Sequence, residues 1–208
     1  RYAVRTLRRR PAFTIVSAIT LALGIGATSA IFGVIDSMLF RPLRYPAPEQ
    51  IVVVSMTRGG SLREAPAYPD FVDWREQSRS FQSLGVSRSQ SLNLTGRETP
   101  ERLSGNFVSA SLLTLLGAEP LAGRLFAHDE TEVGTASPVA VISEGLWRRR
   151  FGADPAIVGS SIVLNAQPFT VIGIVPSTFA FFSGTEVYLP ITYYPNNAGL
   201  TRKDHSMF

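Results

Sequence analysis

The sequence predicts an α+β protein in which one N-terminal transmembrane helix is followed by a two-lobed α+β domain. Three observations predict this class. Residues 11–35 carry no charged side chain, and the ten residues before them contain five arginines. The rest of the chain alternates short β-branched runs with helix-capping patterns and turn residues, which is typical of mixed helices and strands. About 165 residues beyond the apolar stretch suffice for one or two hydrophobic cores.

The uncharged stretch from Pro11 to Ile35 predicts a membrane-spanning helix within residues 11–36. At full helical rise these residues extend roughly 37 Å, and a bilayer's hydrocarbon core is about 30 Å thick. A cleaved signal peptide is the first alternative, but its apolar region is usually shorter and ends in a small-residue cleavage site. A buried helix of a soluble protein is the second, and such helices are also usually shorter.

The arginines before this helix predict its orientation. Residues 1–10 form a basic flank, and basic residues at one end of a span mark the cytoplasmic side. Everything after about Phe40 is therefore expected on the opposite side of the membrane. The residues that carry this topology signal are Arg5, Arg8, Arg9 and Arg10.

The net charge of +4 and the pI near 9.8 come from this flank. Without its five arginines the chain has 15 basic and 16 acidic residues. No basic surface is then left to indicate nucleic-acid binding. The sequence contains no cysteine, which excludes a disulfide framework and thiol chemistry.

Small residues recur within the predicted span at the spacing of helix-packing motifs. Gly26 and Ala30, and likewise Ser29 and Gly33, are four residues apart. Small side chains at this spacing let a second helix approach closely. We expect these residues to form a packing face, although glycine and alanine are also common in membrane helices for other reasons. Residues 37–50 then form a proline-rich linker, since Pro42, Pro46 and Pro48 prevent helix continuation.

Residues 51–120 are predicted as the first α+β lobe. Ile51 to Met56 is a β-branched run typical of a buried strand. Asp70 suits the first turn of a helix, where an acidic side chain is favourable, and Gly117 suits a helix end. The elements expected here are a strand at 51–56, a helix at 68–78, one or two strands within 84–94, a strand at 101–108 and a helix at 110–116.

Residues 121–195 are predicted as the second lobe. A polar loop is expected at 124–134, and Ser143 is expected to cap the following helix, which Gly152 ends. Asn165, Ala166 and Gln167 lie between two apolar runs, and this pattern predicts a hairpin. The expected elements are a strand at 139–142, a helix at 144–151, hairpin strands at 162–164 and 169–175, and a strand at 187–189.

Several segments together resemble MacB-type ABC-transporter permeases. Residues 23–32 and 39–43 resemble the family's first membrane helix and the exit from it. Residues 147–152, 154–159 and 171–176 resemble its periplasmic core domain. The resemblance covers nearly the whole chain in the family's order, but it does not specify a substrate.

The resemblance implies part of an FtsX-like permease of the bacterial inner membrane that has four or more membrane helices. Such permeases dimerise and transmit ATP-driven conformational change to a periplasmic domain, in efflux or export. Implied partners are an ABC ATPase subunit or domain, a second copy or pseudo-copy, the lipid bilayer and a periplasmic adaptor protein. Residues 196–208 would be a truncated segment returning to the first lobe. The chain begins without methionine and is expected to be a fragment.

No catalytic motif is found in the sequence. A phosphate-binding loop places lysine after its glycines, and Lys203 is the only lysine. ATP hydrolysis is therefore expected on another domain or subunit, and the chain is expected to be neither an enzyme nor a cofactor or metal protein. Residues 128–132 contain metal-ligand types, but a solvated acidic loop is the favoured interpretation.

Three other groups of residues leave alternatives open. The arginines at 148–150 suit a helix end, with phosphate or headgroup binding as the alternative. Trp74 and Trp147 suit a core, with a binding surface as the alternative. Phe179, Phe181 and Phe182 are the third aromatic group that could line such a surface, and their place beside a predicted loop favours exposure. For the whole chain the alternatives are a single-pass anchored periplasmic adaptor or sensor, and a membrane-anchored enzyme.

Overall fold

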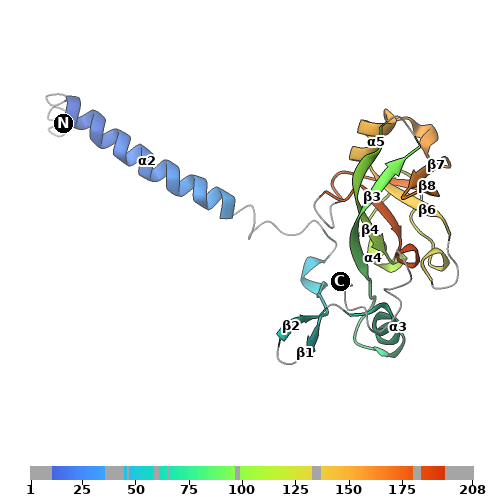
Figure 1. Cartoon of the computed structure of the whole chain (residues 1–208). Coiled ribbons are helices and arrows are strands. Elements are labelled where there is room, and N and C mark those ends of the chain that lie inside the picture. The colour runs from blue at the N-terminus through green and yellow to red at the C-terminus, as the bar shows by residue number, and fades with distance from the viewer. Residues whose placement is uncertain are drawn as a thin grey trace. The chain divides into compact units, whose positions relative to one another are not determined.

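The structure is a computed structural model that describes residues 11–35, 45, 47–58, 61–64, 66–96, 99–132, 137–179 and 184–194. The chain divides into two compact units, residues 1–43 and 44–208, each of which is described by itself. The first unit contains the helix α2, Pro11–Ile35. The bounds of α2 agree with the predicted span. The order of elements also agrees with the predicted class, an apolar helix followed by mixed helices and strands (Figure 1).

A seven-stranded sheet forms the centre of the second unit. In chain order its strands are β3 Ser87–Thr95, β4 Glu101–Val108, β5 Ala122–Gly123, β6 Val139–Ser143, β7 Ser161–Leu164, β8 Gln167–Val175 and β9 Val187–Pro190. Their spatial order is β5-β8-β6-β9-β4-β3-β7. β4 and β9 run parallel, as do β6 and β8, whereas the other neighbours are antiparallel.

The sheet closes on itself because β7 pairs with β3 and also with β8. It pairs with β3 through Leu94 and Leu164, and with β8 along its whole length. The tight turn between β7 and β8 is formed by Asn165 and Ala166, which both have positive φ. Two positive φ angles match the right-handed twist of hairpin strands, so the hairpin predicted here is confirmed.

Both faces of the sheet are buried, which explains why its central strands are apolar without alternation. Along β6, Ala140 and Ile142 belong to one hydrophobic cluster, whereas Val139 and Val141 belong to the other. The helices α3 and α5 contribute to the first cluster, and α4 contributes to the second. The two faces of the sheet are therefore covered by different helices.

These helices begin and end as the sequence predicts. They are α3 Tyr68–Gln77, α4 Ala110–Leu115 and α5 Glu144–Phe151. At α3, the Ala67 amide donates to Asp70 Oδ2 at 3.1 Å, and at α5 the Leu146 amide donates to Ser143 Oγ at 3.2 Å. Gly117 and Gly152 follow their helices with φ of 69° and 61°. Capping by short polar side chains and by left-handed glycine is sequence-local, so these ends were predictable.

The strand predicted at residues 51–56 is wrong except at its last residue. Ile51–Ser55 is without regular structure, and the short hairpin that follows contains β1, Met56–Arg58, and β2, Ser61–Glu64. A β-branched run becomes a strand only when a neighbour satisfies its backbone. Among the described residues no strand pairs with 51–55, and Val52 and Val53 are exposed.

The strands on either side of residue 120 belong to one sheet. β4 precedes this position and β9 follows it, yet the two pair from Gly105 with Val187 to Val108 with Pro190. The predicted lobes 51–120 and 121–195 are therefore joined by main-chain pairing, and their division stays a prediction. For residues 84–94, where one or two strands were expected, the structure has the single strand β3. The linker at 37–50 lies mainly outside the described residues, and its end forms a short 3-10 helix, Pro48–Gln50.

Candidate functional site

The surface of α2 is the first candidate site, because this helix is uncharged and apolar along its length. Within residues 12–33 its large apolar side chains are all exposed, including Phe13, Leu23 and Phe32. The hydroxyls of Thr20 and Thr28 donate to the carbonyls of Val16 and Gly24, one turn earlier. Residues 12–33 are long and apolar enough to cross a membrane. A helix that is apolar all round and has its polar groups satisfied internally suits lipid.

The four predicted packing residues lie on one face of this helix. At 100° per residue, Gly26, Ser29, Ala30 and Gly33 fall within about 100° of arc. Gly24 lies on the opposite side. A side chain added at Gly24, Gly26 or Gly33 would meet nothing within 4 Å. The packing role of this face stays a prediction. The predicted topology residues Arg5, Arg8, Arg9 and Arg10 lie outside the described residues.

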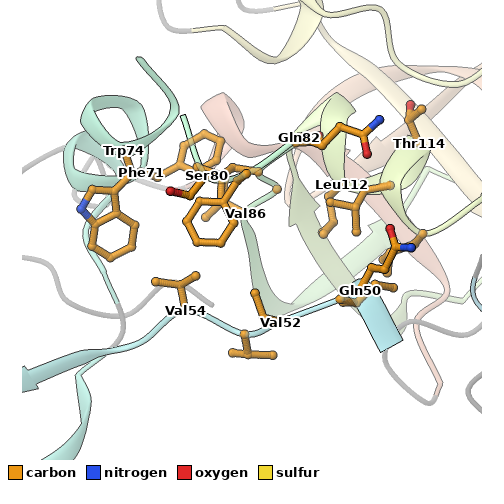
Figure 2. Close-up of a pocket in the computed structure, with 18 of the residues that line it drawn as sticks. Gln50, Val52, Val54, Phe71, Trp74, Ser80, Gln82, Val86, Leu112 and Thr114 are labelled. Atoms are coloured by element: carbon orange, nitrogen blue, oxygen red, sulfur yellow. The ribbon is translucent and has the colours of Figure 1, made fainter. Parts of the chain in front are cut away.

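The second candidate site is an apolar groove in the second unit, which we call the α3–α4 groove (Figure 2). It has a volume of about 740 Å³. Four segments form it: residues 47–54, α3 with Pro66 before it, the loop 80–86, and α4 with Leu116 after it. Its size lies within the range of small-molecule sites, about 300–1,000 Å³.

The side chains of the α3–α4 groove are graded from buried to exposed. Phe71, Val86, Leu112 and Leu116 are buried and contribute to the two hydrophobic clusters of the domain. Trp74 lies half-buried in the wall. The most exposed apolar groups come from other segments: Val53 is 82% exposed, Val52 63% and Phe81 40%. The groove thus opens to solvent above a floor that is part of the core.

Sequence reasoning did not identify this groove. The sequence predicts a core position for Trp74, with a binding surface as the alternative, and in the structure Trp74 lines the groove. Trp147 is half-buried and packs against the hydrophobic cluster to which α5 contributes. Its indole Nε1 donates to the Asp154 carbonyl at 2.8 Å. The sequence signal that could have indicated the groove is the apolar run at 51–54, which the sequence pattern assigns to a buried strand. Of the aromatic run at 179–182, only Phe179 is described, and its ring lies 6.0 Å from that of Tyr188.

The acidic segment 128–132 is held by arginines. Glu130 receives two hydrogen bonds of 2.7 Å from the Arg124 guanidinium and one of 2.8 Å from the Ala127 amide. Glu132 is bound by Arg75 of α3 and lies 3.2 Å from His128 Nε2. Hydrogen bonding from each arginine lowers the pKa of the partner carboxyl. No group of three or more metal-ligating side chains occurs among the described residues.

Two of the three arginines of α5, Arg149 and Arg150, connect this helix to the strands and the loop beside it. Arg149 Nη2 lies 2.6 Å from Glu101 Oε1 and 2.8 Å from Glu186 Oε1. Arg150 Nη2 donates to the Thr99 carbonyl at 2.6 Å, and Arg148 pairs with Glu144 within α5. Glu101 and Glu186 lie at the starts of β4 and β9. The run therefore fixes α5 to the sheet, in addition to its favourable place at a helix C-terminus.

Comparison with known sequences identifies one family. The family described as the MacB-like periplasmic core domain matches residues 14–207, which is nearly the whole chain. No curated protein matches the chain in a sequence search. The family match includes most of α2 and the sheet domain.

Several solved structures share the fold. The periplasmic region of MacB from Actinobacillus actinomycetemcomitans has a TM-score of 0.53 and 20% identity, over 62% of this chain and 57% of that one. The extracellular domain of the noncanonic ABC-type transporter YknZ from Gram-positive bacteria gives 0.53 and 17%, over 68% and 70%. A domain of a permease protein, described as putative, from Porphyromonas gingivalis gives 0.53 and 15%, over 71% and 62%. The chain thus spans between 57% and 70% of these structures' lengths.

Proposed function

The chain belongs to the MacB-like periplasmic core domain family, and from that premise we propose that it is the membrane-anchoring and extracytoplasmic part of an ABC-type export permease. One observation carries the proposal. The family match spans both a helix long enough to cross a membrane and the α+β domain that follows it. A single family thus accounts for the anchor and the domain together.

In this function the chain transmits mechanical work. ATP is hydrolysed by a cytoplasmic ABC ATPase subunit or domain, and the membrane helices pass the resulting motion to the extracytoplasmic domain. The closed sheet suits this role because its strands and the arginine-fixed α5 connect the start of the domain to its end. A domain held in this way moves as a body when its anchor moves.

The partners follow from the same proposal. The open small-residue face of α2 packs against another membrane helix of the permease, within a homodimer or pseudo-dimer. In this proposal α2 spans the bacterial inner membrane, the N-terminus lies in the cytoplasm, and the α+β domain lies in the periplasm. A periplasmic adaptor protein is a further partner. The transported substrate is left open.

Isolation of the complete permease tests the proposal. The full reading frame containing this chain is expressed with its neighbouring ATPase, extracted in mild detergent and purified through a tag on the permease. We expect the ATPase to co-purify and to hydrolyse ATP faster in the complex. Purification of the protein without an ATPase, as a single-pass anchored protein, would support the adaptor or sensor instead.

A further inference from the structure

Asn106 is a buried polar residue without a partner. It lies on β4 and is 0% exposed, and neither its side-chain oxygen nor its side-chain nitrogen forms a hydrogen bond within the described part of the chain. An amide buried in this way loses its hydrogen bonds to water and gains none in return, whereas an apolar side chain of similar shape would avoid that cost. The residue therefore favours any state of the domain in which water reaches it.

Asn106 lies beside Tyr188 on one face of the sheet. The two residues pair across β4 and β9, so their side chains point to the same side. Tyr188 and Val108, which is two residues after Asn106, belong to the hydrophobic cluster on this face. Ser89, which opposes Asn106 on β3, is exposed. Asn106 thus lies at the border between this cluster and the exposed part of the same face.

The segment that leads into the domain packs on the same cluster. We call Tyr45 and residues 47–51 the strap. Tyr45 and Ile51 pack against the cluster that contains Tyr188. Burial is the main cause that raises the pKa of the Tyr188 phenol to about 12, and the Tyr45 phenol contributes to this rise. The two phenols are therefore neighbours, and the strap contacts the part of the sheet where Asn106 is buried.

The strap is attached to the sheet by side chains only. The amides of Gln50 and Ile51 donate to carbonyls within the strap, and among the described residues no backbone hydrogen bond joins the strap to the sheet. Ala47 has a φ of 47°, a left-handed value that a Cβ disfavours. Segments with few buried contacts open more easily than paired strands. The strap can therefore leave the sheet while the strands stay paired.

We propose that the strap is a releasable connection between the linker and the sheet, and that Asn106 promotes its release. With Tyr45 and Ile51 seated on the cluster, movement of the linker reaches the sheet directly. With the strap released, water hydrates the Asn106 amide and the linker gains slack. The release is a property of this chain alone, and only its use in export rests on the function proposed above.

The distance between two spin labels measures release of the strap. Glu49, in the strap, and Ser104, on β4, are exposed, and the chain has no natural cysteine. The full chain with Glu49→Cys and Ser104→Cys is labelled in lipid nanodiscs, without an ATPase, and studied by double electron–electron resonance. Tyr45→Ala removes a side chain that packs on the cluster. We expect this variant to add a second, longer distance to the distribution.

A matched pair of leucine substitutions tests the role of Asn106. Asn106→Leu and Asn93→Leu are each combined with Tyr45→Ala, because Asn93 lies on the same face of the sheet but is exposed. Asn106→Leu should lower the ratio of released to seated strap about tenfold, since leucine gains nothing from water. Asn93→Leu should leave the ratio unchanged. Circular dichroism verifies folding, and Asn106→Val replaces Asn106→Leu if leucine does not fit.

Two results would overturn the proposal. A single, unchanged distance in Tyr45→Ala would mean that other contacts fix the strap to the sheet. Equal effects of Asn106→Leu and Asn93→Leu would mean that hydration of Asn106 does not promote release. Neither measurement uses ATP or an ATPase, so a failure here is distinct from a failure of the co-purification test of the export function.

Discussion

Gly173 lies where a side chain has no room. A Cβ added there would be 2.1 Å from the carbonyl oxygen of Arg124 on the adjoining chain segment. Because that neighbour is backbone next to β5, it cannot move without breaking the β5–β8 pairing. The sequence places this glycine in an apolar run but gives no sign of the close approach, which depends on a strand that is fifty residues away in the chain.

Gly173→Ala should therefore destabilise the domain by about 2 kcal/mol or more, as overpacking does. Urea unfolding of the full chain in nanodiscs, followed by tryptophan fluorescence, measures the change. Gly145→Ala is the control, since its Cβ would meet only Ser143 Oγ at 3.8 Å. Replacing this helical glycine should raise stability by up to about 1 kcal/mol. Equal effects at the two positions would contradict the packing described for Gly173.

Ala166 is strained in the hairpin turn between β7 and β8. Its φ is 65°, a left-handed value that a Cβ disfavours. Ala166→Gly removes the clash and should stabilise the domain by about 0.5–1 kcal/mol in the same urea experiment. Ala156→Gly, within a 3-10 helix, should be destabilising and serves as control. A loss of stability in Ala166→Gly would mean that the turn differs from the one described.

Glu130 makes stability depend on pH. Hydrogen bonding from Arg124 lowers its pKa below the ordinary value of 4.5. A carboxyl whose pKa is depressed by folding contributes stability above its unfolded pKa and loses it as the pH falls through the folded value. Glu130→Gln should cost about 1 kcal/mol at pH 7 and progressively less below pH 4.5.

Thermal unfolding of Glu130→Gln and of the parent chain, at pH 7 and at a pH below 4.5, measures how the stability difference changes with pH. The control is Glu119→Gln, because Glu119 is exposed and forms no ion pair with another described residue. A difference between Glu130→Gln and the parent chain that persists at low pH would mean that the Arg124 pair is not its source.

At the scale of elements, the small-residue face of α2 gives a sharp comparison. A Cβ added at Gly26 or at Gly24 would meet no described atom within 4 Å, but the two positions lie on opposite sides of the helix. In the complete permease, Gly26→Leu should block close helix approach and weaken association by about 1 kcal/mol or more. Gly24→Leu should have little effect.

Cross-linking yield and ATPase stimulation in the purified complex measure this association. Equal effects of the two leucine variants would mean that the face of Gly26, Ser29, Ala30 and Gly33 is not the packing surface.

The elements that sequence predicted well are those with local signals. α5 needs only Ser143, Glu144 and Gly152 to set its ends, and α2 needs only its uncharged length. The run at 51–55 failed because a strand requires a partner, and partner choice is not written in local composition. The α3–α4 groove was missed for the same reason, since four separate segments must meet before it exists.

At the scale of the whole molecule, the sequence indicated the class and the membrane anchor, whereas the closure of the sheet had to come from the structure. β4 and β9 are separated by almost eighty residues, yet they pair in parallel. No local pattern distinguishes that arrangement from two separate lobes. The ion pairs of Arg149 with Glu101 and Glu186 likewise became visible only when three distant segments met.

Accessibility of single cysteines tests the central claim most directly. The natural chain contains no cysteine, so Ser137→Cys and Thr6→Cys can be introduced separately into the complete permease, with cysteines elsewhere in it removed. In cells with a permeable outer membrane, a membrane-impermeant thiol reagent should label Ser137→Cys alone. In the purified complex, ATP should change the labelling rate of Ser137→Cys, and an ATPase-inactive variant should abolish that change. Labelling of Thr6→Cys alone, or a rate at Ser137→Cys that ATP does not alter, would contradict the account.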